Sequence, residues 1–367
     1  MPRRWSDRLR LIAPAVGIYV ASRLVVLALL GSVARATGRT TLGYLTGWDA
    51  HWYLHIAKFG YVSHIPPGSG NWAQCDLGFF PLVPLLVRAG HALTGWTFAS
   101  VGLVLGALFG IAASVVLWIM IRDHYGPDGA NRGVALVFFS PAAVVLSMIY
   151  SETYMIFFVS LSLLALRRKW WVVAGLAAAC ATALDPVGIA ACLPCLYAAV
   201  TEIRASRNWR ALLAPLLAPL GITAFFLYLW RHTGSFLEWF HAQRAGWQRG
   251  PIGTGIPYDM GKFLTHFFVD INPAAKSIGF FVAAAMLWWA WRVRIPGTWL
   301  SAVGGVLFIG ALSPIIGISP RLLLRGFPLL AHTGATMTRR WFTLVFATSA
   351  VAMASLTIMS TSPHWTP

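Results

Sequence analysis

Residues 11–34 read LIAPAVGIYVASRLVVLALLGSVA, an almost unbroken apolar run that follows a basic N-terminus. A helix needs about 20 mainly apolar residues to cross a bilayer. The run is too long for the apolar region of a signal peptide, which has about 7–15 residues. We therefore predict that this stretch is retained as a first membrane-spanning helix. Arg23 lies inside it, and a structural ion pair is its expected role.

The rest of the chain shares this apolar character. Of its 367 residues, 58% are hydrophobic and only 11% are charged, whereas a soluble domain has about 25% charged residues. This composition leaves no room for a separate soluble domain, so we expect a single domain over residues 1–367. The predicted fold is all-α and polytopic, with eleven transmembrane helices at 11–34, 98–121, 133–149, 152–167, 170–184, 187–203, 211–231, 275–293, 298–317, 321–338 and 341–360.

The basic residues predict the orientation of these spans. The net charge is +17, yet the arginines and lysines stand in short clusters between apolar runs, which indicates membrane topology and not nucleic-acid binding. If residues 79–95 form an interfacial helix that does not cross, more than half of the 28 basic residues fall on one side. The positive-inside rule makes that side, with the N-terminus, the cytoplasm. The basic segments expected on the cytoplasmic side are residues 1–10, 122–132, 167–169, 204–210, 292–294 and 338–340.

Two long loops are then expected on the outer side, over residues 35–97 and 232–274. They are rich in Trp, Tyr, His and Gly and lack the charge that is typical of disorder. We expect both loops to be ordered and functional, and the first to contain the interfacial helix. Most of the 11 acidic residues fall on this side: Asp49, Asp76, Glu152, Asp185, Glu238, Asp259 and Asp270.

The densest group of polar and aromatic side chains lies in residues 47–61, which read GWDAHWYLHIAKFGY. The stretch from Ala50 has helical spacing and puts His51 and His55 on one face. Asp49 stands just before this helix. Two interpretations stay open: Asp49 caps the helix, or it is a functional carboxylate at the boundary between membrane and water.

The same stretch has the spacing of a metal site. His51 and His55 are one helical turn apart and Asp49 is close by, but no further ligand is evident. Interfacial polar groups are the preferred interpretation, so we predict no metal and no other cofactor, and no pattern indicates a divalent cation. Cys192 and Cys195 have redox spacing but lie in an apolar run, which favours packing.

Charged residues also stand at the ends of later spans. Glu152 follows Tyr150-Ser151, and an acid at a membrane boundary usually has a partner; it either caps the next helix or belongs to a site. Arg321 and Arg325 are one turn apart at the start of a span, where the helix dipole and two guanidinium groups favour an anion. A lipid headgroup is the alternative ligand of these arginines.

Taken in order along the chain, these motifs resemble the PIG-V-type mannosyltransferases. That family includes the enzyme that adds the second mannose in GPI-anchor assembly and its bacterial relatives. Each motif is short, and their common order gives the resemblance its specificity. The motifs are Trp48-Asp49 with Trp52-Tyr53, Ile56-Ala57 and Gly60-Tyr61; Phe79-Phe80-Pro81-Leu82 with Pro84; Tyr150-Ser151-Glu152; Gln243 with Trp247; and Ser319-Pro320-Arg321 with Pro328-Leu329.

The resemblance implies a GT-C membrane fold and a polyprenyl-phosphate-mannose donor. It also implies that Asp49, the acid of the first outer loop, acts at the catalytic centre. One motif departs from the pattern, because relatives commonly have Arg-Pro-x-Gly where this chain has Asp185-Pro186-Val187-Gly188. If that arginine holds the donor phosphate in relatives, then Arg321, Arg325 or Arg244 must do so here, or the activity is altered or lost.

Together these inferences predict a site. We expect Asp49 to act as general base towards the acceptor hydroxyl and Glu152 to act as a second catalytic acid. The expected partners are the donor, a lipid or glycan acceptor and membrane lipids, and the active site faces the extracytoplasmic side of the cell membrane. The predicted donor-phosphate residues are Arg321, Arg325, Arg244 and Lys262, and the predicted sugar or acceptor residues are His51, Trp52, Tyr53, Gln243, Trp247 and Asp185.

Two other classes of protein compete with this prediction. A lipid or oligosaccharide transporter (a flippase) explains the spans and the basic sites, but it does not explain two long aromatic outer loops with clustered acids. A non-catalytic membrane subunit is favoured slightly by Asp185. Loss of function on changing one outer carboxylate, without loss of folding, would favour the enzyme.

Overall fold

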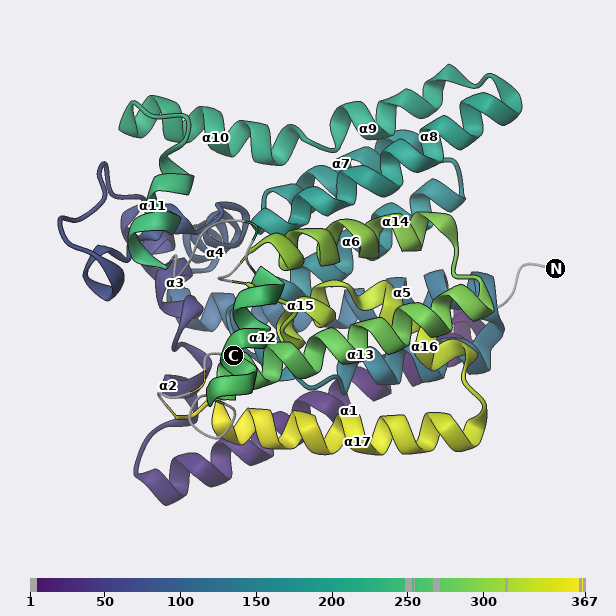
Figure 1. Ribbon diagram of the computed structural model, residues 1–367, viewed down its shortest axis with the longest axis horizontal. Coiled ribbons are helices and arrows are strands. Elements are labelled where there is room, and N and C mark those ends of the chain that lie inside the picture. The colour runs from purple at the N-terminus through teal and green to yellow at the C-terminus, as the bar shows by residue number, and fades with distance from the viewer. Residues whose placement is uncertain are drawn as a thin grey trace.

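The computed structural model describes residues 5–247, 253, 255–266, 271–313, 316–362 and 365. Within these ranges all regular secondary structure is helical, which confirms the all-α prediction. Asp270, one of the acids expected on the outer side, lies outside the described residues. The longest helices lie side by side and cross the width of the molecule (Figure 1). They are α1 (Trp5–Thr37), α5 (Phe98–Phe138), α13 (Ile271–Val293) and α17 (Arg339–Met359).

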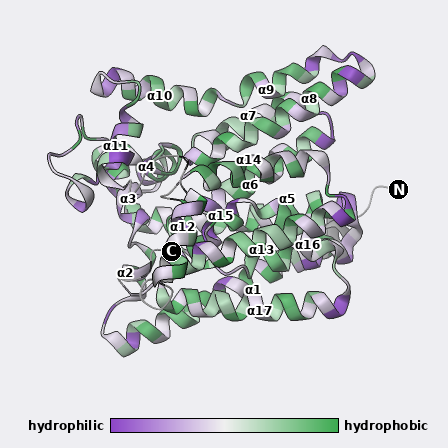
Figure 2. Ribbon diagram, viewed as in Figure 1, coloured by the Kyte–Doolittle hydropathy of each residue, from purple (hydrophilic) through white to green (hydrophobic). Residues whose placement is uncertain are grey.

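The chain is a multi-pass membrane protein. In the described part of the chain, six helical stretches are long and apolar enough to cross a membrane: Leu11–Thr37, Phe98–Phe138, Pro186–Ser206, Trp209–Thr233, Pro273–Val293 and Arg339–Met359. Apolar residues cover the helices along the bundle (Figure 2). Several predicted spans correspond to shorter helices, namely α6 (Glu152–Arg167), α7 (Trp171–Thr182), α14 (Gly297–Leu312), and α15 (Pro320–Arg325) with α16 (Phe327–Thr336).

Two of the six stretches are divided into shorter elements. Pro186–Ser206 consists of the 3-10 helix η4 (Pro186–Ala191) and α8 (Cys192–Ser206). Trp209–Thr233 contains η5 (Trp209–Leu212), α9 (Leu213–Leu217) and α10 (Leu220–Thr233). Pro194 lies in the first stretch, and Pro215 and Pro219 lie in the second. Proline interrupts a helix because it lacks a backbone N–H and cannot continue the hydrogen-bond ladder.

Helix α5 is a hairpin of two helical segments. At its middle Gly126 has φ 74° and ψ 177°, a backbone conformation that glycine adopts readily because it has no Cβ. Trp118 Nε1 donates to Asn131 Oδ1 at 2.8 Å across 13 residues of sequence. In a continuous helix these residues would be separated by about 20 Å. The chain therefore reverses at Gly126, inside the basic turn predicted at residues 122–132.

The predicted span 133–149 is wrong in its second half. Helix α5 ends at Phe138, and the chain continues as irregular structure and the 3-10 helix η3 (Ala143–Ser147). The reason is Pro141, which cannot donate a helical hydrogen bond and disfavours the helical conformation of Ser140 before it. Apolar composition alone predicted a helix here because it does not register this break.

Arg23 compensates for the broken helix. Its guanidinium donates to the carbonyl oxygens of Phe138 and Ala143 at 3.1 and 2.5 Å, and to Ser147 Oγ at 2.9 Å. Carbonyls at a helix end have no partner within the helix, and here the buried arginine supplies one. The prediction of an ion pair for Arg23 is therefore wrong, since its described hydrogen-bond partners are backbone carbonyls and the hydroxyls of Ser22 and Ser147.

Basic turns gather at one end of the bundle. Arg167 Nη2 donates to Asp123 O at 2.6 Å, and Lys169 Nζ lies 2.8 Å from Glu202 Oε1. These contacts bring the tip of the α5 hairpin, the α6–α7 turn and the end of α8 together. The α8–α9 and α16–α17 turns lie at the same end, and α3 and α11 lie at the opposite end (Figure 1). The predicted cytoplasmic clusters thus share one end of the molecule.

The two outer loops contain short helices. In Figure 1, α4 is seen nearly end-on, across the direction of the long helices, which fits the interfacial orientation expected for residues 79–95. The first loop contains α2 (Thr41–Leu45), α3 (Asp49–Phe59), η1 (Gly70–Ala73), η2 (Asp76–Gly78) and α4 (Leu82–Thr94), and the second contains α11 (Glu238–Gly246) and α12 (Gly255–His266).

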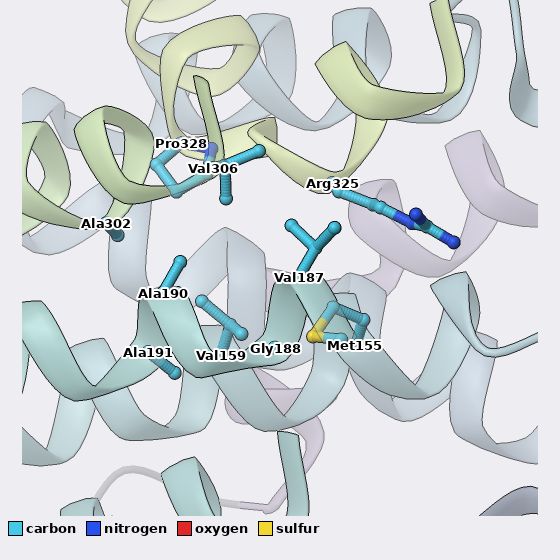
Figure 3. A pocket seen from close by; sticks show the side chains of 10 residues that line it. All are labelled: Met155, Val159, Val187, Gly188, Ala190, Ala191, Ala302, Val306, Arg325 and Pro328. Carbon is cyan, nitrogen blue, oxygen red and sulfur yellow. The ribbon is translucent and has the colours of Figure 1, made fainter. Parts of the chain in front are cut away.

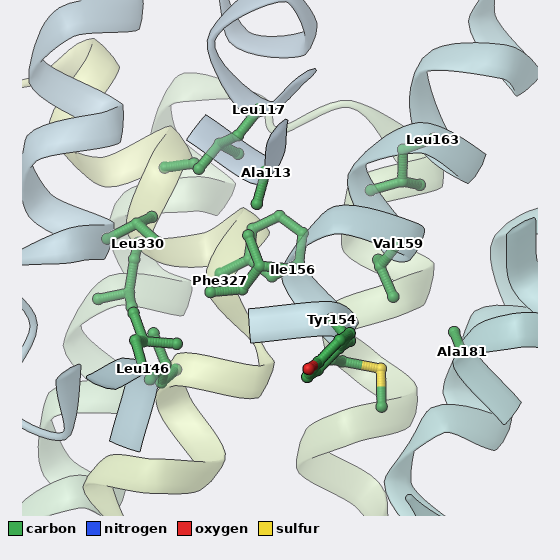
Figure 4. Close-up of a cluster of buried hydrophobic side chains, with 14 of the residues drawn as sticks. Ala113, Leu117, Leu146, Tyr154, Ile156, Val159, Leu163, Ala181, Phe327 and Leu330 are labelled. Carbon is green, nitrogen blue, oxygen red and sulfur yellow. The ribbon is translucent and has the colours of Figure 1, made fainter. Parts of the chain in front are cut away.

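A buried apolar cluster holds α5, α6 and α16 together. Leu117, Ile156 and Phe327, one from each helix, are all fully buried in it (Figure 4). Glycine allows the close approach, because a Cβ on Gly133 would lie 2.8 Å from the Ala331 carbonyl oxygen. Small residues at helix interfaces commonly serve this purpose in membrane proteins. The packing fixes α16, and with it the preceding α15, against the start of α6.

Candidate active site

Asp49 is the first residue of α3, at the end of the bundle that holds the outer-loop helices. Trp48 precedes it with φ 55° and makes no side-chain capping bond, an uncommon conformation for a residue other than glycine. Trp48 Nε1 donates to Ser360 O at 3.1 Å, and the Asp49 N–H donates to Tyr150 Oη at 3.2 Å. The N-cap of α3 is Trp48, so the prediction that Asp49 caps this helix is wrong. The Asp49 carboxylate binds another partner.

That partner is Arg321. Its Nη1 lies 2.7 Å from Asp49 Oδ2, and its Nε donates to Glu152 Oε1. The guanidinium also lies over the Tyr150 ring, 4.6 Å from the ring centroid, at a favourable cation–π distance. Arg321 thus joins the first outer loop to the start of α6.

Helix α15 presents Arg321 and Arg325 on one face. Ser319 Oγ caps the helix by accepting a hydrogen bond from Leu322 N at 3.2 Å, and Pro320 occupies the first helical position, where its missing N–H costs nothing. Arg325 follows one turn after Arg321. Its Nη2 lies 2.8 Å from Glu152 Oε1 and 2.6 Å from Asp185 Oδ2.

Two buried carboxylates hold these arginines from the inside. Glu152 begins α6, and both arginines donate to its Oε1, so this acid has the charged partners expected at a membrane boundary. Asp185 is the N-cap of η4: its Oδ1 accepts from Val187 N at 2.9 Å while its Oδ2 pairs with Arg325. We refer to the linked side chains as the five-residue ion network, which consists of Asp49, Arg321, Glu152, Arg325 and Asp185.

The network runs from the surface into the protein. The exposed fraction of the side chain falls from 25% at Asp49 to 16% at Arg321 and 1% at Glu152. Three carboxylates face two guanidinium groups, so the inner charges are paired and one carboxylate is in excess. Of its three acids, Asp49 is the one that solvent and substrates reach most easily.

Trp52, Phe79 and Trp247 form an aromatic cluster between the two outer loops. Trp52 stacks on Phe79 with ring centroids 5.7 Å apart, and Trp247 meets both rings edge-on at 6.2 and 5.8 Å. Gln243 Nε2 donates to Gly78 O at 3.0 Å. A Cβ on Gly78 would lie 2.8 Å from the Trp247 ring, so this packing requires glycine. The fold brings together residues of both predicted outer-loop motifs.

The other predicted site residues lie around the network. Tyr53 is buried on α3, and this burial, together with the carboxylates of Asp185 and Asp49, raises the pKa of its hydroxyl well above the usual range. It is therefore a neutral hydrogen-bonding group. Among the described residues, no ion pair joins Arg244 or Lys262 to the network, and His51 contacts the rings of Trp52 and His55.

The sequence predictions omit two residues of this region, Asp76 and Tyr150. Asp76 is almost fully buried, lies 3.2 Å from His55 Nδ1 and accepts a hydrogen bond from Val62 N at 3.1 Å. Burial raises the pKa of the Asp76 carboxyl, against the opposing effects of the Val62 N–H and His55. No sequence signal separated Asp76 from the other outer acids, whereas Tyr150 stood in the Tyr150-Ser151-Glu152 motif and could have been found there.

The metal-like spacing of the first outer loop does not produce a cluster in space. His55 pairs with Asp76, and Asp49 pairs with Arg321. In the part of the chain that the structure describes, no three His, Cys, Asp or Glu side chains are placed to hold a metal ion.

A small pocket lies beside the inner end of the network (Figure 3). Apolar side chains from α6, η4 and α14 line it, among them Met155, Val187 and Val306. Figure 3 shows Arg325 at its edge, with the guanidinium directed away from the apolar lining. The inner end of the charged network therefore borders an apolar gap in the packing.

The helical bundle has a membrane fold of the GT-C type, as its likeness to solved structures shows. Among the structures that the chain resembles are two crystal structures of ArnT from Cupriavidus metallidurans. The structure bound to undecaprenyl phosphate gives a TM-score of 0.56 at 18% identity and covers 93% of this chain and 63% of ArnT. The apo structure gives 0.54 at 18% identity, with 90% and 61% covered.

This chain spans about three fifths of the length of ArnT, and the likeness shows a common fold. No protein-family model matches the chain, and no curated protein matches it either. The PIG-V-type resemblance therefore remains a prediction, which the fold accommodates.

Proposed function

We propose that this protein is a membrane glycosyltransferase that moves a sugar, predicted to be mannose, from a polyprenyl-phosphate donor to a lipid or glycan acceptor. The observation that supports this most is the ion pair between Asp49 and Arg321, 2.7 Å apart at the accessible end of a buried charge network. The network places an acid that can accept a proton next to a cation that can hold a phosphate. It does so in a fold shared with a protein crystallised with undecaprenyl phosphate.

Asp49 is the general base in this proposal. Sugar transfer requires that the acceptor hydroxyl loses its proton as its oxygen attacks the anomeric carbon. The proton passes to the Asp49 carboxylate, the new C–O bond forms, and the bond from the anomeric carbon to the phosphate oxygen breaks. One displacement would invert the anomeric centre, and the PIG-V-type resemblance implies a β-linked donor and an α-mannoside product.

Arg321 stabilises the leaving phosphate, whose negative charge grows as the bond breaks. Arg325 lies deeper and is held by Glu152 and Asp185, so it supports the position of Glu152 and contributes positive potential. Arg244 and Lys262, on the helices of the second outer loop, are the reserve residues for the phosphate.

The aromatic cluster is the proposed acceptor or sugar subsite. Trp52 stands three residues after Asp49 on α3, and positions three apart are neighbours on a helix surface. Its ring, with that of Trp247, offers an apolar face for a sugar ring. His51, Tyr53 and Gln243 supply hydrogen-bonding groups around it, and Asp185 takes part through the network.

The active site is proposed to face the extracytoplasmic side. The basic turns gather at the end of the bundle opposite α3 and α11, and the positive-inside rule assigns such turns to the cytoplasm. Protease accessibility or cysteine labelling at Arg39 and Arg207 would test this assignment, since the two residues lie at opposite ends of the bundle.

The activity is tested by transfer of labelled mannose from polyprenyl-phosphate-mannose in membranes that contain the wild type or Asp49→Asn. We expect a labelled product with the wild type only, at equal amounts of folded protein, and the product identifies the acceptor. A variant that keeps most of the activity would remove Asp49 from the base role. No transfer by well-folded wild type across many acceptors would favour another sugar donor first and then the transporter.

A further inference from the structure

Both arginines of the ion network already form ion pairs with carboxylates. Arg321 binds Asp49 and Glu152, and Arg325 binds Glu152 and Asp185. A phosphate that approached Arg321 would meet the Asp49 carboxylate on the same guanidinium, and like charges at such distances repel strongly. A phosphate therefore cannot bind here in addition to these pairs, and must replace one of them.

Burial decides which pair is replaced. Arg325, Glu152 and Asp185 have side chains that are at most 8% exposed, and separating a buried pair leaves an uncompensated buried charge. The pair of Asp49 with Arg321 is the most exposed of the network, so its separation leaves the least buried charge. The contact that yields to a phosphate is therefore the one between Asp49 and Arg321.

The surrounding contacts allow this exchange without rearrangement of the fold. Arg321 keeps its bond to Glu152 and its place over the Tyr150 ring. The Asp49 backbone stays tied to the Tyr150 hydroxyl at 3.2 Å. Rotation of the Asp49 side chain is then sufficient, and helices α3 and α15 keep their positions.

We propose that Arg321 exchanges partners during the reaction. It holds the Asp49 carboxylate while no donor is bound, and it passes to the donor phosphate on binding, which frees Asp49 to accept the proton of the acceptor hydroxyl. This inference rests on the proposed function and deepens it, because it couples availability of the base to occupancy of the phosphate site. Attack on the donor is thereby delayed until its phosphate is in place.

The test measures the affinity of the purified full-length protein, in nanodiscs, for a polyprenyl phosphate that carries no sugar. Asp49→Asn removes the carboxylate that competes with the lipid phosphate for Arg321, so this variant should bind the lipid about fivefold to tenfold more tightly than the wild type, as expected for a partly exposed ion pair. Asp49→Ala should show the same gain. The matched control is Glu238→Gln, which removes one negative charge on α11, where Glu238 pairs with His241 outside the network; it should change the affinity less than twofold.

A double-mutant cycle separates partner exchange from a general effect of charge. Arg321→Gln should weaken binding, and the gain from Asp49→Asn should disappear in the Arg321→Gln background. Equal gains in Asp49→Asn and Glu238→Gln, or a gain that persists without Arg321, would overturn the exchange. Failure of every folded variant to bind the lipid would overturn both the exchange and the donor class. The expected pattern of affinities without sugar transfer by the wild type would uphold the exchange and contradict the proposed function.

Discussion

Arg325 Nε lies 3.0 Å from Glu152 Oε1, although 173 residues separate the two in the chain. This hydrogen bond joins the start of α6 to α15, and Asp185 completes the pairing of the same arginine at 2.6 Å. The inner half of the network is therefore a structural support for its outer half, where Asp49 and Arg321 meet. The following predictions separate these two roles.

Asp185→Ala should destabilise the protein by about 2–4 kcal/mol, because Arg325 loses a buried partner and η4 loses its N-cap. Asp185→Asn keeps an oxygen that can cap Val187 and should be destabilised less. Thermal unfolding of both variants in detergent micelles, beside the wild type, gives the order of stability. Equal melting temperatures for all three proteins would contradict the structural role of Asp185.

Gly279→Ala should lower sugar transfer at least tenfold. A Cβ at this position of α13 would overlap the Ile318 carbonyl oxygen, and Ile318 leads into Ser319, the N-cap of α15. The strain, about 1–3 kcal/mol for overpacking, would displace the helix that presents Arg321. Gly304→Ala is the matched control, since a Cβ there meets no atom within 4 Å. Equal transfer rates of the two variants would show that α15 tolerates the shift.

Trp247→Ala should raise the KM for the acceptor about tenfold and change kcat little, because it removes one wall of the aromatic cluster and leaves the ion network in place. Trp72→Ala, in the first outer loop, is the control, since Trp72 is 85% exposed and lies outside the cluster. Steady-state kinetics with a fixed donor concentration gives both constants. A loss confined to kcat would move Trp247 from substrate binding to the chemical step.

Asp76 predicts a pH dependence of stability. Burial raises the pKa of its carboxyl in the folded protein above the unfolded value of about 3.9, so the folded state binds this proton more tightly than the unfolded state does. The stability contributed by the protonated carboxyl is full below the unfolded pKa and is lost as the pH rises to the folded pKa. The stability of Asp76→Asn relative to wild type should therefore increase over this interval. Melting curves at successive pH values measure the difference, and a constant difference would contradict the prediction.

Much of the fold could be predicted from the sequence because each membrane-spanning segment must satisfy its backbone hydrogen bonds internally. A run such as residues 11–34 must be helical in lipid, where every backbone N–H and C=O needs an internal partner. The break after Phe138 was missed because Pro141 interrupts a stretch that is apolar throughout. The hairpin at Gly126 was predicted only as a basic turn, since its geometry depends on one glycine and on contacts such as that between Trp118 and Asn131.

Composition and hydropathy along the chain were enough to predict an all-helical membrane protein with basic turns, two long aromatic loops and the charged residues Asp49, Glu152, Asp185, Arg321 and Arg325. How these charges pair depends on the packed fold: Arg321 binds Asp49 and Arg325 binds Asp185, on either side of Glu152. The difference lies in the range of the interactions. Hydropathy and helix geometry act over neighbouring residues, whereas an ion pair needs contact within about 4 Å, and contact between residues so far apart in sequence exists only once the helices have packed.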